Sequence, residues 1–502
     1  MRGMTQTDVL VVGAGPTGLM LACDLARRGV AVRVVDRAPE FPDGSRGKGL
    51  NPRSLEVLDD LAVIDRILAS GTTHLPHRRY RGAQVMAEVD PEAGRVPTAD
   101  VPYPTGVMIP QWRVEQILRE RLADFGVAVE LGAELRGFDQ DADGVTATVG
   151  EAQIRARYLV GCDGGRSTVR PALGLSLRGE TPDVQLMAVG DVEVDGLSRD
   201  AWHQWLTADG GIMLCPLPGT EAFQVQASHE VDRDGSPLEP TLERFQQTFD
   251  RVAGVPGVRL RDLAWRSSYR VNVRMVDRLR VGRVFLAGDA AHVHPIAGGL
   301  GMNTGIQDAY NLGWKLGLVL AGDATPGLLD TYEEERLPIA SWLLDITSEL
   351  LDAILDGIRQ RGGGLDAGSA RDLSQLRLGY PWSRLSLRTT NRPTGPHPGD
   401  RAPDAPLRDP ATGTPTRLFD LFRGPHFTLL GLGRRAAPAL GDLEPGITRP
   451  YLVGPGGLLD DDGHVADAYG TDALVLVRPD GHVGLVAEPT DARGVAEYLR
   501  AL

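Results

Sequence analysis

A glycine-rich turn near the N-terminus constrains the fold more than any other feature of this chain. The run 7–12 (TDVLVV) predicts a buried strand, and the apolar positions after residue 18 predict a helix. The turn between them contains Gly13, Gly15, Pro16, Thr17 and Gly18. In this setting the first glycine permits a tight turn, the second lets a pyrophosphate approach the backbone, and the third lets helix and strand pack closely. We therefore expect a Rossmann-like α/β fold with an anion site at the helix N-terminus.

An acidic residue follows at the position that a dinucleotide site requires. Asp36 ends the next expected strand, 31–35, about 20 residues after the turn, and Arg37 comes directly after it. A carboxylate there accepts hydrogen bonds from a ribose. A glycine turn that binds no ligand is the alternative, but strand, helix and acid all fall where the ligand needs them. This segment alone does not distinguish NAD from FAD.

A second glycine region, far along the chain, favours FAD. Residues 283–287 (RVFLA) predict a strand that ends in Gly288-Asp289, and Asp289 is placed to bond the ribityl diol of a flavin. The loop behind it leads into an expected helix from 304 to about 320 and contains Pro295, Gly298, Gly301, Met302 and Asn303. A helix N-terminus stabilises the negative charge that reduced flavin carries near N1 and C2=O. A purely structural loop is the alternative.

Between these two regions lies the segment CDGGRSTVR, residues 162–170. With it, the chain resembles the group A flavoprotein aromatic hydroxylases, the para-hydroxybenzoate hydroxylase superfamily. Within that superfamily it is most similar to the bacterial hydroxylases that tailor aromatic polyketides. The resemblance runs from Asp8 to about Arg336 and includes the stretches 45–50 (SRGKGL), 51–58 (NPRSLEVL) and 110–113 (PQWR).

The resemblance implies roles for further residues and a reaction. Asp163 and Gly164 are associated with FAD and NADPH binding. Arg46 and Gly47 lie beside the isoalloxazine, and Gln111 contacts the ribityl side of FAD. NADPH or NADH reduces FAD, O2 adds to form a flavin C4a-hydroperoxide, and the distal oxygen is transferred to a phenolic, polyketide-type ring. No second GxGxxG is evident, so the nicotinamide cofactor binds without a Rossmann domain of its own.

Catalytic and substrate residues are less clearly marked. Arg46, by its charge near the flavin, and His294, as a proton relay just after the Gly-Asp motif, are the catalytic candidates. A solvated loop charge and a structural histidine are the respective alternatives. The candidates for an aromatic substrate pocket are Trp205, Met213 and Tyr269, although packing in a sheet core is the commoner fate of such residues.

Changes of pattern along the chain divide it into three domains. The FAD-binding domain is expected over three separate segments, 1–71, 106–179 and 275–390. Alternating apolar runs in 180–274 predict antiparallel strands, which form an inserted β-sheet substrate domain together with 72–105. Residues 391–502 begin in a Pro- and Gly-rich linker and resemble the thioredoxin-like C-terminal domain of many aromatic hydroxylases.

Cysteine usage limits what the C-terminal domain does. Only Cys23, Cys162 and Cys215 occur, without close pairing, so neither a disulfide framework nor a CxxC metal site is expected. Thioredoxin chemistry needs paired thiols. The C-terminal domain is therefore expected to be structural or associative, and assembly of a homodimer is one such role. A chain that ends near Arg392 should still carry FAD, because every flavin motif precedes it.

Charge and hydropathy narrow the remaining classes. The net charge of −14 argues against nucleic-acid binding. No apolar run approaches the roughly 20 residues of a membrane span, and the N-terminus has no apolar leader segment. We expect a cytoplasmic enzyme that binds an aromatic small molecule and O2, with no metal, nucleic acid or membrane partner.

Three alternatives stay open from the sequence. The first is a Baeyer–Villiger or antibiotic-inactivating monooxygenase of the same superfamily. The second is a flavin reductase or dehydrogenase that forms no oxygenated product. The third is a non-enzymatic FAD-binding protein.

Overall fold

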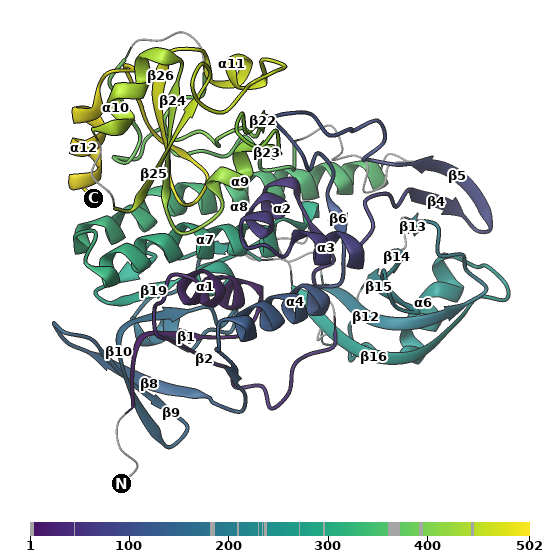
Figure 1. Ribbon diagram of the computed structural model, residues 1–502. Coiled ribbons are helices and arrows are strands. Elements are labelled where there is room, and N and C mark those ends of the chain that lie inside the picture. Colours follow the sequence, from purple (N-terminus) through teal and green to yellow (C-terminus); the bar gives the residue numbers. More distant parts are fainter. Residues whose placement is uncertain are drawn as a thin grey trace.

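The computed structural model describes residues 5–44, 46–180, 186–207, 210–228, 230–232, 234, 238–270, 272–294, 297–359, 372–390, 395–442 and 446–502. Within these ranges the chain forms three main sheets, each with helices against it (Figure 1). The fold class expected from the sequence is confirmed: a Rossmann-like α/β part, an inserted β-sheet and a thioredoxin-like C-terminal part.

The first sheet has eight strands and carries the glycine-rich turns. Its main path runs β18-β19-β10-β1-β2-β7, and β8 and β9 extend it from β10. The strands are β1 (Thr5–Val12), β2 (Val32–Val35), β7 (Val129–Glu130), β8 (Leu135–Gln140), β9 (Val145–Val149), β10 (Ala152–Gly161), β18 (Arg280–Val281) and β19 (Val284–Leu286). β1 pairs in parallel with β2 and β10, and β10 with β19. Parallel pairing brings the carboxyl ends of these strands, and the turns that follow them, to one edge.

Helices cover this sheet and bury an almost continuous apolar core. They are α1 (Pro16–Ala26), α2 (Pro52–Asp60), α3 (Ile64–Ser70), α4 (Gln111–Asp124), α5 (Val169–Ala172), α7 (Leu300–Ala321) and α8 (Asp330–Arg359). α7 lies directly on α1 because three of its residues have no side chain. A Cβ at Gly305, Gly313 or Gly317 would overlap side chains of α1 and the residues just after it.

The second sheet has seven strands and lies to the right in Figure 1, in the order β16-β12-β15-β14-β13-β4-β5. Its strands are β4 (His77–Arg81), β5 (Gln84–Val89), β12 (Leu186–Asp195), β13 (Trp202–Thr207), β14 (Gly210–Pro216), β15 (Ala222–Ser228) and β16 (Arg259–Arg270). Helix α6 (Leu242–Val252) packs on one face with Phe245 and Phe249. The residues near 72–105 thus join those of 180–274 in one sheet.

Two small sheets connect these parts. β11 (Arg178–Glu180), β17 (Val273–Met275) and β20 (His292–Val293) form one, and β3 (Gly49–Leu50) and β6 (Val107–Met108) form the other. Each joins segments that flank the crossings between the first and second sheets. A Cβ at Gly44 would overlap Trp265 of β16, so the chain contacts the second sheet at this point.

The C-terminal sheet has five strands in the order β21-β27-β26-β24-β25 and stands above α7 and α8 in Figure 1. Its strands are β21 (Leu387–Arg388), β24 (Phe427–Leu432), β25 (Thr448–Val453), β26 (Ala473–Val477) and β27 (Val483–Ala487). A hairpin of β22 (Pro406–Arg408) and β23 (Pro415–Arg417) and the helices α9 (Leu418–Phe422), α10 (Ala437–Gly441), α11 (His464–Tyr469) and α12 (Ala492–Arg500) complete this part. All three cysteines lie outside it and are free thiols, so it holds no dithiol.

Candidate functional site

The first glycine turn leaves open space in front of α1. Gly13 has φ +103°, a conformation that favours glycine, and a Cβ there would strike the backbone at Cys162. A Cβ at Gly18 would strike the Gly13 carbonyl, which explains the third glycine. At Gly15, by contrast, no atom lies within 4 Å of the Cβ position. Pro16 starts α1, where a missing N–H costs no hydrogen bond. The turn thus has the shape that a pyrophosphate needs.

Asp36 closes this turn from the end of β2. Its Oδ2 accepts a hydrogen bond from the Ala14 N–H at 2.7 Å, and its Oδ1 accepts one from the Ala38 N–H at 2.8 Å. Each carboxylate oxygen has a second lone pair available for a ribose hydroxyl. The neighbouring Arg37 is exposed. Asp36 therefore shapes the glycine turn and is also positioned to bind a sugar.

The second motif presents a buried carboxylate oxygen that has no partner. Asp163 follows β10, and its Oδ2 accepts hydrogen bonds from the N–H groups of Thr168 and Val169 at 2.6 and 3.1 Å. Its Oδ1 is buried and has no hydrogen-bond partner among the described residues. A Cβ at the adjacent Gly164 would meet open space. An unsatisfied buried oxygen is costly in a protein without its ligand, so this atom fits a donor supplied by a bound cofactor.

The Gly-Asp motif packs against the first turn. Gly288 begins a short 3-10 helix (Gly288–Ala290), and a Cβ there would lie 2.6 Å from Thr17 Oγ1. Arg170 of the second motif donates to the Ala290 carbonyl at 2.9 Å, so the three motifs meet at one edge of the sheet. The Asp289 carboxylate is exposed and makes no hydrogen bond or ion pair among the described residues. It is available for the ribityl hydroxyls of a flavin.

A buried carboxylate that the sequence did not single out holds the Gly-Asp turn. Asp308 on α7 accepts hydrogen bonds from the Gly288 N–H at 3.0 Å, from His292 Nε2 at 2.7 Å and from Arg336 Nε at 2.7 Å. Burial alone would raise the pKa of Asp308, but Arg336 and His292 keep it below its ordinary value. The Asp308 carboxylate thus fixes the turn in place.

The glycine loop before α7 is also closely packed on one side and open on the other. A Cβ at Gly301 would lie 2.6 Å from His294 Nε2, which places the His294 ring against the first turn of α7. Gly299, at φ +63°, caps α7, and no atom lies within 4 Å of its Cβ position. Gly298 faces Leu350. Pro295, which the sequence also predicts to bind the cofactor, lies outside the described residues.

Gly47, Gln111 and Met302 come together across three segments. Gln111 Oε1 accepts from the Gly47 N–H, and the Gln111 N–H donates to the Gly47 carbonyl, both at 3.0 Å. The Met302 sulfur lies 3.7 Å from the Cβ position of Gly47. Arg46 is exposed and makes no hydrogen bond or ion pair within the described ranges. Gln111 Nε2 in turn donates to Glu115, whose pKa is raised by burial to about 7.

A network of side-chain amides fixes the same loop from behind. Asn303 accepts from the Asn51 N–H at 2.9 Å and donates to the carbonyls of Gly49 and Gly299 at 3.2 and 2.8 Å. Gln375 Oε1 accepts from Asn51 Nδ2 at 2.5 Å. The sequence offered one signal for this arrangement: Asn51 followed by Pro52 is a helix N-cap pair, and Asn51 does cap α2.

The structure places Trp205 and Met213, two of the three residues expected to line a substrate pocket, on opposite faces of the second sheet. Trp205 lies in the apolar core under α6, where its ring stacks on Tyr80 with centroids 4.6 Å apart and its Nε1 donates to the Gly82 carbonyl. Trp205 thus packs in the sheet core, which was the alternative interpretation, and it lies on the face of the sheet that α6 covers. Met213 is buried on the opposite face. Tyr269 belongs to β16, and its side chain lies outside the described part of the structure.

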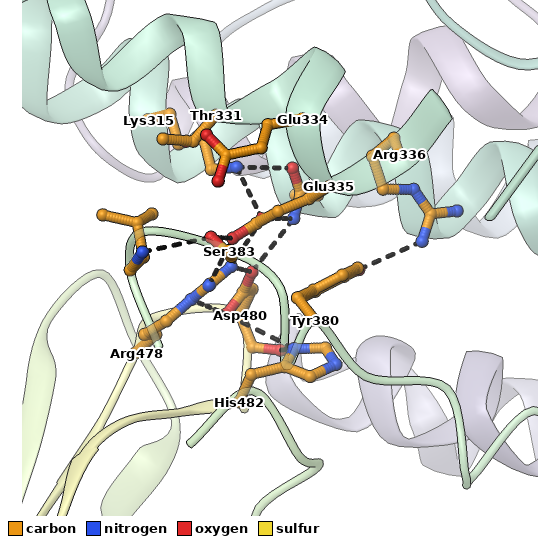
Figure 2. Close-up of polar contacts among 12 residues, drawn as sticks. Lys315, Thr331, Glu334, Glu335, Arg336, Tyr380, Ser383, Arg478, Asp480 and His482 are labelled. Carbon is orange, nitrogen blue, oxygen red and sulfur yellow. Dashed lines mark hydrogen bonds and ion pairs between the residues drawn. The ribbon is translucent and has the colours of Figure 1, made fainter. Parts of the chain in front are cut away.

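A buried ion-pair network joins α7 and α8 to the C-terminal sheet (Figure 2). Glu335 accepts from Lys315 Nζ at 2.7 Å and from Arg478 Nη1 at 2.6 Å, and Arg478 Nη2 also reaches Asp480 at 2.5 Å. These four side chains are at most 1% exposed. Burial lowers the pKa of Lys315 to about 8. No pattern in the sequence indicates this network, since charged side chains are usually solvated.

Other types of site are not found among the described residues. No group of three or more His, Cys, Asp or Glu residues there could hold a metal ion. No described helix is long and apolar enough to cross a membrane. A cavity of about 550 Å³ opens at the β14–β15 turn, but none of its lining residues is one predicted to bind the cofactor.

Comparison with known proteins defines the class to which this fold and site belong. Residues 6–347 match the FAD binding domain family, and residues 395–502 match the aromatic-ring hydroxylase, C-terminal family. The chain therefore belongs to the FAD-dependent aromatic-ring hydroxylases, and it is a flavin-dependent monooxygenase. FAD is its cofactor and NAD(P)H is the typical reductant of the family, as the sequence resemblance implied.

Individual relatives agree with this assignment along the whole chain. A flavin-dependent monooxygenase of Mycobacteroides abscessus is 44% identical over 503 residues, covering 98% of this chain and 99% of the relative. The 6-methylpretetramide 4-monooxygenase of Streptomyces rimosus is 35% identical, covering 99% and 93%. Among solved structures, the flavin-dependent monooxygenase PieE in complex with FAD and substrate is similar with a TM-score of 0.86, at 25% identity and 99% coverage of both chains.

Proposed function

We propose that this protein hydroxylates a phenolic ring of a polycyclic, polyketide-type substrate, with NADPH as reductant and O2 as oxidant. The observation that carries the proposal is the meeting of three motifs at one sheet edge. Together they offer an open pyrophosphate turn at Gly15, an unpartnered buried oxygen on Asp163 and an uncommitted carboxylate on Asp289. Bound FAD supplies the activated oxygen.

Relatives support the polycyclic substrate class. The 6-methylpretetramide 4-monooxygenase is 35% identical to this chain. The structure of aklavinone-11 hydroxylase with FAD and aklavinone is similar with a TM-score of 0.81 at 29% identity. The first name describes oxygenation of 6-methylpretetramide and the second hydroxylation of aklavinone, and both proteins align along nearly the full chain.

The proposed roles of the residues follow from their places. Gly13, Gly15 and Gly18 hold the pyrophosphate, with Pro16 and Thr17 at the start of α1, while Asp36 and Arg37 face the adenosine ribose. Asp163, Gly164, Gly288 and Asp289 hold the centre of FAD. The flavin ring is surrounded by Arg46, Gly47, Gln111, Pro295, Gly298, Gly301, Met302 and Asn303. His294, beside Gly301, relays a proton from a phenolic substrate, and Arg46 adds positive charge near the ring.

The domain boundaries, the location in the cell and the oligomeric state are part of the same proposal. We assign FAD binding to residues 1–71, 106–179 and 275–390, the substrate sheet to 72–105 and 180–274, and the third domain to 391–502. A cytoplasmic location suits an enzyme that draws on the cell's NAD(P)H. The C-terminal domain has a structural role and is the part proposed to contribute to a homodimer.

The direct test is oxygen incorporation. Purified holoenzyme is supplied with NADPH, 18O2 and a series of polycyclic phenols and quinones. The masses of the products are then measured by mass spectrometry. The expected result is accelerated NADPH oxidation and a product heavier by one 18O atom for a fused-ring phenol. NADPH oxidation that yields only hydrogen peroxide with every compound would contradict the proposal and favour a reductase.

A second candidate function rests on two relatives that are named rifampicin monooxygenase. The rifampicin monooxygenase of Streptomyces venezuelae is 41% identical over 346 residues, covering 68% of this chain and 70% of the relative. Oxygenation that inactivates an antibiotic is therefore the alternative. Rifampicin in the same series, followed by product structure determination, separates ring hydroxylation from Baeyer–Villiger insertion and from antibiotic inactivation.

A further inference from the structure

One face of the seven-stranded sheet is polar although it is buried. Register places Gln204 opposite Met213, Met213 opposite Gln226, and Asp191 opposite Gln224, so these side chains share the face turned away from α6. Each is at most 6% exposed. A buried sheet face is normally apolar, as the α6 face of this same sheet is. We call these five residues the amide face.

The Gln204 side chain lacks a hydrogen-bond partner in the described part of the chain. Both its Oε1 and its Nε2 are buried and unpaired among the described residues, and the residue is 1% exposed. Two residues away on the same face, the Trp202 Nε1 is also buried without a partner. By contrast, Gln226 donates to Gln224 at 3.0 Å. An unpaired buried amide is unfavourable, so Gln204 is positioned to pair with a group that the described residues do not provide.

A lysine reaches the amide face from the flavin side. Lys48 lies in the segment next to Gly47, and its Nζ donates to Gln224 Oε1 at 2.6 Å and lies 4.4 Å from the Trp202 ring centroid. It forms no ion pair within the described ranges. Burial lowers the pKa of Lys48, while Cys215 and Asp191 act in the opposite direction. An ammonium group so placed attracts an anionic or strongly polar oxygen.

We propose that the amide face and Lys48 together bind the oxygen atoms of the substrate. Lys48 binds a phenolic or enolic oxygen as its anion, and the amide of Gln204 binds a neighbouring carbonyl and hydroxyl. The inference rests on the proposed hydroxylase function and names its substrate class: a fused-ring phenol with a hydroxyl beside a ring carbonyl.

The spacing and chemistry favour such a molecule over a simple phenol. Trp202 and Gln204 are two residues apart on one strand, about 7 Å, which is longer than a single aromatic ring. An amide offers both a donor and an acceptor, and a hydroxyl beside a carbonyl offers the complementary pair. Lys48 adjoins Gly47, one of the residues proposed to surround the flavin, so one segment contacts both the substrate and the flavin region.

The test uses FAD-loaded enzyme and two probes, 1,8-dihydroxyanthraquinone, whose two hydroxyls flank one carbonyl, and anthraquinone. Titration by difference absorbance should show that wild-type enzyme binds the hydroxylated probe at least tenfold more tightly. Its bound spectrum should shift toward that of the phenolate. Lys48→Met should remove both the preference and the spectral shift. Equal binding of both probes by wild-type enzyme would overturn the inference.

Gln204→Leu supplies a readout that a purely structural role would not give. Binding of 1,8-dihydroxyanthraquinone should weaken about tenfold. The Tm of the probe-free enzyme should rise by about 2 °C, because an unpaired amide is replaced by an apolar group. Gln247→Leu, on the exposed side of α6, is the matched control and should leave the binding of the probe unchanged. Unchanged binding in Gln204→Leu, or a fall in its Tm, would overturn the role of Gln204.

This test is separate from that of the proposed function. Binding of the probes requires neither NADPH nor O2, so it can succeed even where no 18O enters a product, and that result would count against hydroxylation alone. Conversely, an enzyme that oxygenates phenols but ignores the hydroxyl–carbonyl pair would overturn only the present inference.

Discussion

Asp289 offers the most direct test of a single cofactor contact. Its carboxylate is exposed and makes no hydrogen bond or ion pair among the described residues, so Asp289→Ala should leave folding intact. Loss of a charged hydrogen bond to the ribityl chain should weaken FAD binding roughly tenfold or more. Reconstitution of apoprotein, followed by flavin fluorescence, measures this. Asp462→Ala is the control, since Asp462 is also exposed; the same FAD affinity in both variants would refute the ribityl assignment.

Glu115 predicts a pH dependence of stability. Burial raises its pKa from 4.5 to about 7, so the folded protein holds a proton that the unfolded chain has lost between these values. The protein therefore loses stability as pH rises through this window, by at most about 3 kcal/mol. Glu115→Gln retains an acceptor for Gln111 and removes this loss. Thermal unfolding should show no difference at pH 4, where both states hold the proton, and a higher Tm for the variant at pH 8; a constant difference would contradict the assignment.

At the residue scale, the motif residues could be predicted from the sequence, but the distant residues that hold them in place could not. Gly13, Gly18 and Asp36 lie within one strand–turn–helix–strand unit, so local spacing is enough to predict their places in the turn. Asn51 and Gln375 are 324 positions apart and meet only because the fold is complete. Asp308 could equally have been a solvated helix residue, since its partners are set by packing.

At the scale of elements, strand register determined which face of the sheet each side chain lies on, a point that the sequence pattern left open. Aromatic and apolar residues of β13 and β14 were expected either to line a pocket or to pack in a core. Pairing placed Trp205 opposite Ile212, under α6, and Met213 opposite Gln204 on the other face. A shift of one residue would exchange the two faces, and the sequence alone does not determine that register.

The glycine loop before α7 can be tested against the other end of the same helix. Gly299 and Gly322 both have positive φ, at +63° and +85°, and no atom lies within 4 Å of either Cβ position. Valine at either site should cost about 1–3 kcal/mol of stability through backbone strain. Only Gly299→Val should also lower turnover, because it fills space beside the proposed flavin ring. Anaerobic stopped-flow absorbance measures flavin reduction; equal rates in both variants would show that the loop is merely a turn.

At the scale of the whole molecule, buried charge joins the C-terminal sheet to the rest. Arg478→Met leaves Glu335 and Asp480 without their shared partner, and breaking a buried pair costs about 3–5 kcal/mol. Urea unfolding should show this loss. Arg493→Met removes an exposed pair with Glu497 and should change stability by less than about 1 kcal/mol. Similar stabilities of the two variants would show that the buried network contributes little.

The same contacts refine the expected effect of truncation. A chain that ends near Arg392 retains every motif predicted to bind FAD, and we still predict that it binds the cofactor. It also loses the partners of Glu56, Asp59 and Glu335 in the C-terminal part. We therefore expect reduced stability to accompany retained flavin. The sequence could not predict this, because ion pairs between distant segments leave no periodic pattern.

Asp308 connects the turn predicted to bind FAD with the residues that contact the C-terminal sheet. It bonds the Gly288 N–H on one side and Arg336 on the other, and Arg336 reaches Tyr380, whose ring packs on His482 beside β27. If these contacts help to hold the FAD turn, then FAD must strengthen the attachment of the C-terminal sheet by the same free energy. Amide hydrogens of β26 and β27 should accordingly exchange more slowly with deuterium in holoenzyme than in apoprotein. Identical exchange in both forms would mean that the two regions are energetically independent despite their contacts.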